Sequence, residues 1–256
     1  MIPKTIHYIW FGNNEKNSEV IRCIDSWKKH LPDYEIIEWN EQNFDVSKYA
    51  YVKEALDAKM YAFASDFVRL WVVYNYGGIY LDTDVEVIKS YDNLLHNNAF
   101  FGTEEIDSIN SGLSFGAEKG NKVIQDLLNL YKENDFINKD GSFNLKTTNM
   151  MITEYFVKHG YKLNAKIQTI QNVIIYPRQY FSPISWWSDK KNITSRTYSI
   201  HWYEASWLPN NFSNKYINTI INSFKHYAVL ALRILFGYSS YDYIKKHLNN
   251  IYKFFS

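Results

Sequence analysis

The stretch that decides the fold of this chain is Tyr76-Gly77-Gly78-Ile79-Tyr80-Leu81-Asp82-Thr83-Asp84. Its two glycines predict the end of a helix, because glycine readily adopts the left-handed backbone of a helix C-cap. The apolar run that follows predicts a short strand, which leads directly into two carboxylates spaced by one residue. Carboxylates at a strand end are well placed to hold a hard divalent cation, which can neutralise a departing diphosphate. Asp82 and Asp84 are therefore the first candidate site residues.

The sequence on both sides of this stretch predicts strands that alternate with helices. Residues 2–12 are rich in β-branched and aromatic residues and end in a turn signal, which predicts a first, central strand. Residues 52–76 have helical periodicity in two pieces, broken near Ala58 and Lys59. Further predicted elements are helices over 20–31, 121–132 and 146–158 and strands over 34–39, 79–81, 99–103, 109–116, 173–176 and 198–203. This order predicts an α/β fold with a mixed, mostly parallel central sheet and helices on both faces.

The composition limits the classes to which the protein can belong. Of 256 residues, 46% are hydrophobic and 21% are charged, which is typical of a folded globular protein. A formal net charge of +1 argues against nucleic-acid binding driven by overall charge, so we expect no nucleic-acid partner. The single cysteine, Cys23, excludes an intramolecular disulfide and a zinc site of several thiolates. Neither a signal peptide nor a membrane-spanning run is found, which predicts a cytoplasmic protein.

A second pair of candidate residues, Asp66 and Arg69, lies on the predicted helix before the two glycines. The pair lies at the edge of the helix's apolar stripe, which consists of Phe63, Phe67, Leu70 and Tyr74. We expect both side chains to be half-buried. A carboxylate and a guanidinium that face a cleft can bind sugar hydroxyls and a phosphate, since arginine offers a planar fork of donors. The alternative is a structural ion pair within one helix.

Other interpretations of the two aspartates remain open at this point. An EF-hand loop would need a glycine at the position of Glu86 and a helix directly in front. A phosphatase of the haloacid-dehalogenase type would use Asp82 as its nucleophile and would want Thr or Val at that same position. As a third alternative, the two aspartates would belong to a solvated acidic turn with no catalytic or binding role. A non-catalytic sugar-binding module is also possible, because aromatic residues make up 18% of the chain and stack well on sugar rings.

Three motifs, taken together, resemble those of glycosyltransferase family 32. They are Ile2-Pro3-Lys4-x-Ile6-His7-x-Ile9-Trp10-x-Gly12, Ala64-Ser65-Asp66-x-x-Arg69 and Tyr76-Gly77-Gly78-Ile79-Tyr80-Leu81-Asp82-x-Asp84. The family includes capsular polysaccharide sugar transferases, fungal outer-chain α-mannosyltransferases and the catalytic domains of large glucosylating toxins. The resemblance is dense over residues 1–118, thins over 119–195 and returns at 201–207. It implies a GT-A fold, dependence on Mn2+ or Mg2+, and transfer of a hexose with retention of its anomeric configuration.

The resemblance also implies the partners. The donor is a nucleotide sugar, with UDP-hexose favoured, and the acceptor is a glycan or a lipid-linked oligosaccharide, as in the synthesis of surface or capsular polysaccharide. By position, Trp10 resembles the aromatic residue that stacks on the nucleotide base, with Ile9 next to it in the donor site. Asp82 resembles the ligand of ribose or sugar hydroxyls, and Tyr80 belongs to the same donor-binding set.

The remaining implied roles concern the sugar, the metal and the end of the catalytic part. Asp66 and Arg69 resemble the pair that contacts the donor sugar, and with Asp82 and Asp84 they form the implied catalytic set; Asp84 is the direct metal ligand. The segment His201-Trp202-Tyr203-Glu204-Ala205-Ser206-Trp207 resembles the family's closing segment, in which a metal ligand, a serine and a tryptophan cap the donor. His201 is the expected second metal ligand, with Glu204 as the alternative, and Ser206 and Trp207 would bind the nucleotide sugar. The loops Asn110-Ser111-Gly112 and Thr147-Thr148-Asn149 are candidates for the acceptor side.

The last part of the sequence has a different character. Six basic residues against Asp242 alone give residues 215–256 a net charge of +5, which leaves −4 for residues 1–214. We therefore expect a catalytic domain over 1–214 and a basic, amphipathic helical tail over 215–256. Such a helix suits an anionic membrane surface, which predicts peripheral attachment to the inner face of a membrane. The alternative is a helical hairpin packed on the catalytic domain.

Overall fold

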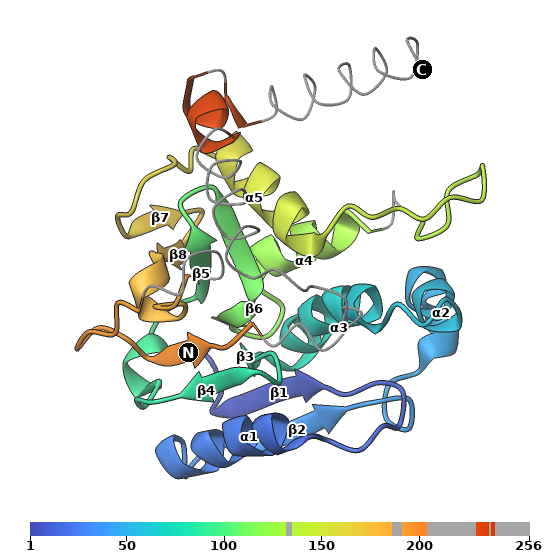
Figure 1. The fold of residues 1–256 in the computed structure, drawn as a ribbon, viewed down its shortest axis with the longest axis horizontal. Coiled ribbons are helices and arrows are strands. Elements are labelled where there is room, and N and C mark those ends of the chain that lie inside the picture. The colour runs from blue at the N-terminus through green and yellow to red at the C-terminus, as the bar shows by residue number, and fades with distance from the viewer. Residues whose placement is uncertain (132–134, 186–190, 204–228, 236, 239–256) are drawn as a thin grey trace, which may run out of the picture.

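A seven-stranded sheet forms the centre of the molecule in the computed structural model, which describes residues 1–131, 135–185, 191–203, 229–235 and 237–238. The strand order is β2-β1-β3-β6-β5-β8-β7, and only β6 and β7 run against the other five. The strands are β1 Thr5–Ile9, β2 Glu35–Trp39, β3 Gly78–Tyr80, β5 Ala99–Glu105, β6 Ser108–Ala117, β7 Gln168–Ile170 and β8 Val173–Tyr176. The predicted mixed, mostly parallel α/β sheet is confirmed (Figure 1).

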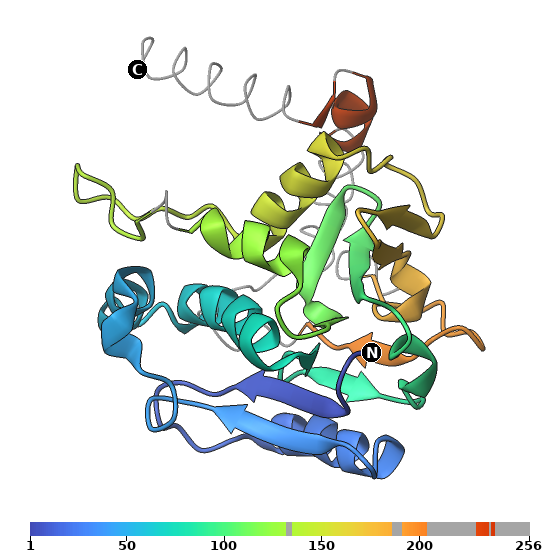
Figure 2. The same cartoon turned by 180° about the vertical axis from the view of Figure 1, so that it is seen from behind.

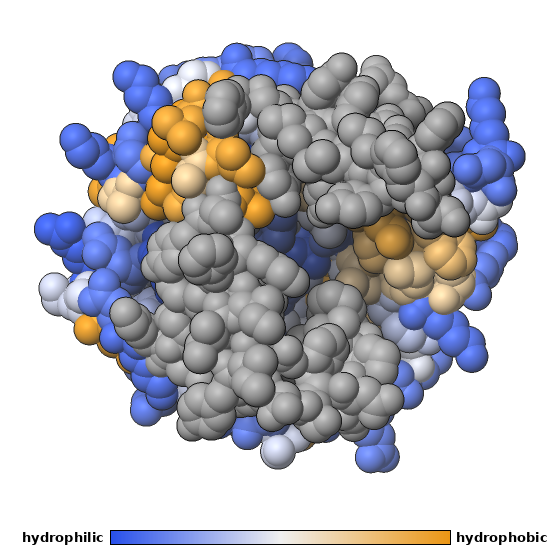
Figure 3. All heavy atoms as spheres, turned by 45° about the horizontal axis from the view of Figure 1, so that its top comes forward, coloured by the Kyte–Doolittle hydropathy of each residue, from blue (hydrophilic) through white to orange (hydrophobic). Residues whose placement is uncertain are grey.

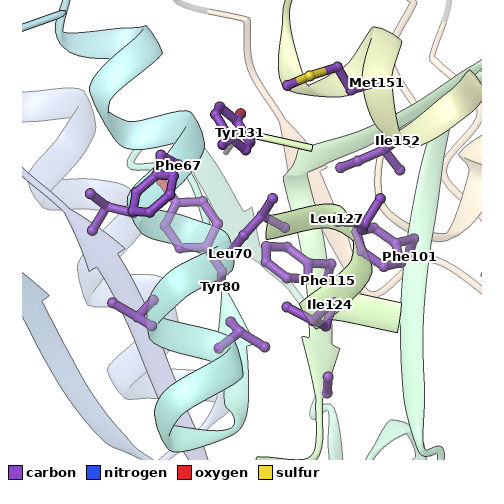
Figure 4. Packing of buried hydrophobic residues seen from close by; sticks show 14 of the residues in the cluster. Phe67, Leu70, Tyr80, Phe101, Phe115, Ile124, Leu127, Tyr131, Met151 and Ile152 are labelled. Carbon is purple, nitrogen blue, oxygen red and sulfur yellow. The ribbon is translucent and has the colours of Figure 1, made fainter. Parts of the chain in front are cut away.

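Helices cover both faces of this sheet, as Figures 1 and 2 show from opposite sides. Helices α2, α3, α4 and α5 pack into one buried cluster, and α1 packs into the other, together with a second, two-stranded sheet of β4 and β9. Their bounds are α1 Ser18–His30, α2 Ala50–Asp57, α3 Tyr61–Tyr76, α4 Lys122–Asn129, α5 Thr148–Lys158, β4 Val85–Val87 and β9 Ser199–His201, with 3-10 turns η1 Val46–Lys48, η2 Asp92–Leu94 and η3 Arg178–Tyr180. The first cluster fills the space between α3, α4, α5 and the sheet (Figure 4).

Most predicted elements are confirmed, and the differences have physical reasons. The break in the helical stretch lies at Ala58 and Lys59, where Lys59 has a positive φ of 57°. The predicted first strand is shorter than 2–12, because only Thr5–Ile9 pairs with β2, and within it only Ile6 and His7 also pair with β3. The strand predicted over 198–203 is limited to β9 and pairs with β4 in place of the main sheet. Strands β4 and β7, of three residues each, were missed because such short runs carry no detectable periodicity.

A buried histidine joins the first motif to the two glycines. His7 is fully buried; its Nε2 lies 2.8 Å from the carbonyl oxygen of Gly77, and its Nδ1 accepts a hydrogen bond of 3.1 Å from Trp39. Burial lowers the pKa of His7 to about 4, so the ring is neutral and donates from Nε2. Gly78 has a φ of 102° and lies so close to Thr5 and His7 that a side chain would not fit. The start of the sheet is therefore fixed to the turn that precedes β3.

The described part of the C-terminal segment contacts the turn between β5 and β6. Arg233 donates a hydrogen bond of 2.7 Å to Asp107, and the two side chains are only 14% and 5% exposed. The guanidinium also lies 4.3 Å from the centre of the Tyr238 ring, which is buried. Ile234 and Leu235 on the same short helix are exposed, and Figure 3 shows apolar residues on the face that carries this segment. The predicted boundary near Asn214 lies outside the described residues and stays a prediction.

Within the residues that the structure describes, none of the helices combines the length and the apolar character that crossing a membrane requires.

We expect Arg233→Ala to lower the free energy of unfolding by about 1.5–3 kcal/mol, because it leaves the buried carboxylate of Asp107 without its charged partner. Urea unfolding followed by circular dichroism measures this change. Arg196→Ala removes an exposed arginine and serves as the control. Equal stability of both variants would show that the ion pair contributes nothing to the fold.

Candidate functional site

Two aspartates and a histidine come together where β3 ends. Asp82 and Asp84 follow β3, and His201 ends β9, which pairs with β4 so that His201 lies opposite Val85. One ligand atom from each of the three side chains lies within 4.8 Å of the others. Nε2 of His201 is 3.1 Å from Oδ1 of Asp84, and the backbone N–H of Trp202 donates to the carbonyl oxygen of Asp84 at 3.1 Å. The small second sheet thus brings residues 117 positions apart into one cluster.

The donor atoms of this cluster suit a hard or borderline divalent cation. Two carboxylates and one imidazole are ligands that Mn2+ accepts, and the carboxylates also suit Mg2+. Nδ1 of His201 is buried and has no hydrogen-bond partner among the described residues. Nε2 of the same ring faces Asp84, so it is the nitrogen that would bind a cation together with Asp84. Asp84 and His201, the predicted metal ligands, therefore lie together with Asp82 in a cluster that fits a divalent cation.

Arg69 lies between two of the predicted carboxylates. Its Nη2 is 3.1 Å from Oδ1 of Asp66 and 3.3 Å from Oδ1 of Asp82, and the guanidinium lies 4.9 Å from the centre of the Tyr80 ring. The Tyr80 hydroxyl donates to the same Oδ1 of Asp82 at 2.8 Å. Asp66 is half-buried, as expected, whereas Arg69 is buried more deeply than expected. The helix motif and the strand-end motif therefore meet in one network.

The charges in this network shift one another's pKa values. Burial works against the charge on Arg69, but the negative charges of Asp82 and Asp66 raise the pKa of Arg69. Burial raises the pKa of Asp66, and Arg69 opposes that shift. For His201, burial favours the neutral ring, yet Asp84, Asp82 and Glu104 together raise its pKa. The site is thus a cluster of acidic groups in which Arg69 is the buried cation.

A glycine on β6 leaves the space that the Asp82 carboxylate occupies. A Cβ on Gly112 would collide with Oδ2 of Asp82, so no other residue fits there without moving the aspartate. The backbone N–H of Asp82 donates to the carbonyl oxygen of Gly112 at 3.1 Å. Asn110, two residues earlier, accepts a hydrogen bond of 2.6 Å from the Gly112 N–H. The predicted loop Asn110-Ser111-Gly112 is therefore part of strand β6 and directly supports the strand-end carboxylate.

The second predicted acceptor loop lies next to the first and contacts Asp66. Thr148 begins α5, and its backbone N–H donates to Oδ2 of Asp66 at 3.2 Å. The side-chain oxygen of Asn149 accepts from both the N–H and the hydroxyl of Ser111, at 3.0 and 3.3 Å. Nη1 of Arg69 lies 3.5 Å from the hydroxyl of Ser111. Both predicted loops are therefore adjacent to the donor-site residues.

Glu104 on β5 is a member of this site that the sequence did not reveal. It accepts a hydrogen bond of 3.1 Å from Asn110, and desolvation raises its pKa against the opposing effect of His201. The register between β5 and β6 shifts between Phe101 and Gly102 and again between Thr103 and Glu105, so the second shift contains Glu104. Bulges of this kind redirect side chains near active sites, but they depend on strand pairing, so no local sequence signal marks Glu104.

The other predicted residues occupy different surroundings. Ile9 is buried in the core, whereas Trp10 is half-buried and begins the loop after β1. The indole Nε1–H of Trp10 donates to the carbonyl oxygen of Asn14 at 2.7 Å, and the ammonium group of Lys16 lies 5.5 Å from its ring centre. Glu204, Ser206 and Trp207 lie outside the described residues, so their roles stay predictions.

Comparison with known proteins identifies the region that carries the two aspartates. Residues 17–101 match a family model described as a glycosyltransferase sugar-binding region containing a DXD motif. Inositol phosphoceramide mannosyltransferase 3 of Schizosaccharomyces pombe is 33% identical over 130 residues, which are 48% of this chain and 35% of that protein. An uncharacterized glycosyltransferase, L373, of Acanthamoeba polyphaga mimivirus is 26% identical over 240 residues, 86% of this chain and 92% of that protein. The chain thus aligns with about a third of the length of the yeast relative.

Two solved structures that a search with this chain finds are named as glycosyltransferases. PaToxG glycosyltransferase has a TM-score of 0.49 at 21% identity, covering 61% of this chain and 68% of that one. The galactosyltransferase LgtC, solved with donor and acceptor sugar analogues, has a TM-score of 0.46 at 13% identity, with coverage of 86% and 95%.

The matched region contains Asp66, Arg69, Asp82 and Asp84, the residues that the structure brings into one network. A DXD region on a mixed α/β sheet agrees with the predicted GT-A fold. Residues 17–101 match the model of the glycosyltransferase sugar-binding region with a DXD motif, which agrees with the predicted resemblance and supports the predicted enzyme class, a glycosyltransferase.

Proposed function

We propose that this chain is a metal-dependent, retaining glycosyltransferase that moves a hexose from a nucleotide sugar to a glycan or lipid-linked acceptor. The observation that carries the proposal is the cluster of Asp82, Asp84 and His201 beside the Asp66–Arg69 pair, within a DXD glycosyltransferase region. A phosphatase or a non-catalytic sugar-binding module would not account for the match of residues 17–101 to that family. UDP-hexose is the favoured donor, and turnover of UDP- and GDP-sugars in the presence of Mn2+ tests this choice.

Each residue of the site has a distinct proposed role in donor binding. Asp84, His201 and Asp82 would hold Mn2+ or Mg2+, which when bound neutralises the negative charge of a leaving diphosphate. Arg69 fixes Asp82 on one side, and Tyr80 donates to the same oxygen, so this carboxylate is held before the donor arrives. Asp66 is oriented by Arg69 and by the N–H of Thr148, and it is the carboxylate proposed to bind donor hydroxyls. Ser206 and Trp207 are proposed to cover the donor.

The acceptor side is proposed to involve a lipid surface. The name of the yeast relative refers to inositol phosphoceramide, a lipid, which supports a lipid-linked acceptor for this chain. The basic residues of 215–256 would attract an anionic leaflet, while Arg233 keeps part of the tail on the catalytic fold. Synthesis of a surface polysaccharide such as a capsule is the process that we propose for this enzyme.

Asp84→Asn should lower nucleotide-sugar turnover at least about a hundredfold without unfolding the protein, because it removes a proposed metal ligand. Turnover is measured as release of nucleoside diphosphate at several Mn2+ concentrations, and folding is checked by circular dichroism. Asp57→Asn, at an exposed position on α2, is the matched control. Full activity of a folded Asp84→Asn variant would refute the metal assignment.

Trp10→Ala should weaken UDP binding by about 1–3 kcal/mol, the range for a base that stacks on an aromatic ring. Isothermal titration calorimetry measures the affinity, and quenching of tryptophan fluorescence by UDP gives a second readout. Trp10→Phe keeps a stacking surface and should retain most of the affinity. Unchanged UDP binding by folded Trp10→Ala would assign this residue to packing alone.

The double variant Lys245→Glu/Lys246→Glu should lose binding to vesicles of phosphatidylglycerol and phosphatidylcholine, since each basic residue near an anionic surface contributes about 1 kcal/mol. Co-sedimentation at low salt measures binding, and added salt should weaken it for the unmodified protein by screening. Lys28→Glu/Lys29→Glu reverses an equivalent pair on α1 and should still bind. If the unmodified protein does not co-sediment with these vesicles at low salt, the membrane proposal is wrong.

A further inference from the structure

A cavity lies on another face of α3 from the one that carries Asp66 and Arg69. It is a cavity of about 410 Å³ between the η1–α2 segment, α3 and α4, a volume within the range of small-molecule sites. Residues from three separate parts of the chain line it: Lys48, Tyr49, Ala50, Tyr51, Phe67, Trp71, Tyr74, Asn75, Gln125, Leu128, Asn129, Tyr131 and Asp135. None of these residues belongs to the proposed donor site.

Aromatic rings form the walls of this cavity. Tyr51, Phe67 and Tyr131 are buried, with the Phe67 and Tyr131 rings 5.4 Å apart and the Tyr51 and Tyr131 rings 4.8 Å apart. Figure 4 shows Phe67 on α3 and Tyr131 next to it. Trp71 and Tyr74, one helical turn apart on α3, are only partly buried. The cavity thus has a buried aromatic floor, and two partly buried aromatic residues complete its lining.

The rim carries hydrogen-bonding side chains with little net charge. Gln125 and Asn129 are exposed and lie four residues apart on α4, so they point to the same side of that helix. Asn75 adds a third amide from α3, where its Nδ2 donates to the carbonyl oxygen of Trp71 at 2.8 Å. Lys48 and Asp135 add one positive and one negative charge, which offset each other.

The combination of aromatic walls and an amide-rich rim of low net charge favours one class of small ligand over others. A nucleoside diphosphate would need several cationic groups, and Lys48 is the one cationic residue in the lining. An acyl chain would pack on the rings but would form no hydrogen bond with the amides of the rim. A neutral, polyhydroxylated ring suits both the aromatic walls and the amide rim. Its apolar face can pack on an aromatic ring, and its hydroxyls can form hydrogen bonds with the amides. We propose that this cavity is a second carbohydrate-binding site, which takes a neutral pyranose unit of a glycan.

The cavity shares a wall with the donor site. The Tyr131 hydroxyl is hydrogen-bonded to the Thr148 hydroxyl, and the Thr148 N–H donates to Asp66 at 3.2 Å. A saccharide in the cavity is therefore separated from the reacting centre by one layer of side chains and is not itself the reacting sugar. If the proposed function holds, this site retains a distal unit of a glycan near the enzyme; the binding itself does not depend on that function.

Saturation-transfer difference NMR tests the site with three probes: methyl α-mannopyranoside, methyl α-glucopyranoside and methyl β-galactopyranoside. We expect saturation transfer to the ring protons of at least one probe. The double variant Gln125→Ala/Asn129→Ala should weaken its affinity at least about fivefold, the effect of losing one hydrogen bond. Gln42→Ala, at an exposed glutamine outside the cavity, is the matched control and should leave the affinity unchanged.

A second comparison separates this site from the donor site. Asp84→Asn should keep saccharide binding, and UDP with Mn2+ should not displace the probe. Loss of turnover in Asp84→Asn with retained probe binding supports both proposals, whereas full turnover with retained binding refutes only the metal assignment. Absence of saturation transfer from all three probes would overturn the proposed site, as would binding that survives the double variant or is displaced by UDP.

Discussion

The buried guanidinium of Arg69 is the constraint on which the rest of the site depends. Asp66, Asp82 and Asp84 are brought close together, and carboxylates in so small a volume repel one another. Arg69 offsets this repulsion by binding Asp66 and Asp82 from one nitrogen, while Asp84 is held by His201. The helix α3 must therefore lie where its first turns face the end of β3, which determines how the helix packs on the sheet.

The placement of β3 in turn follows from the first motif. His7 binds the carbonyl oxygen of Gly77 and accepts from Trp39, and the absence of a side chain at Gly78 allows the backbones to approach. Because burial keeps His7 neutral, it can serve as donor on one side and acceptor on the other without a charged partner. His7 and Gly77 belong to different motifs and lie 70 positions apart in the sequence, yet they are in direct contact in the structure. His7 has a structural role, although it lies close in sequence to a predicted donor residue.

Local patterns in the sequence predicted the parts of the fold that local forces determine. The turn glycines, the helix break at Lys59 and the long buried strands have strong local signals, and they occur where expected. The contacts of Glu104 depend on register shifts between β5 and β6, and the Arg233–Asp107 pair joins residues 126 positions apart. Neither set of contacts can be predicted from local sequence, because both depend on tertiary packing. The cavity beside α3 was missed for the same reason: its lining comes from three separate segments.

The cluster of Asp82, Asp84 and His201 also depends on a short, two-stranded sheet. Two of its members follow β3 in the central sheet, whereas the third reaches the site only through pairing of β4 with β9, three residues on each strand. A two-stranded sheet of this size is marginal by itself and is held by its packing on α1, where the Trp27 indole donates to the Val85 carbonyl oxygen at 2.7 Å. A cation bound by Asp82, Asp84 and His201 would join the two sheets directly. Metal binding would therefore stabilise the pairing of β4 with β9, in addition to any effect on the donor.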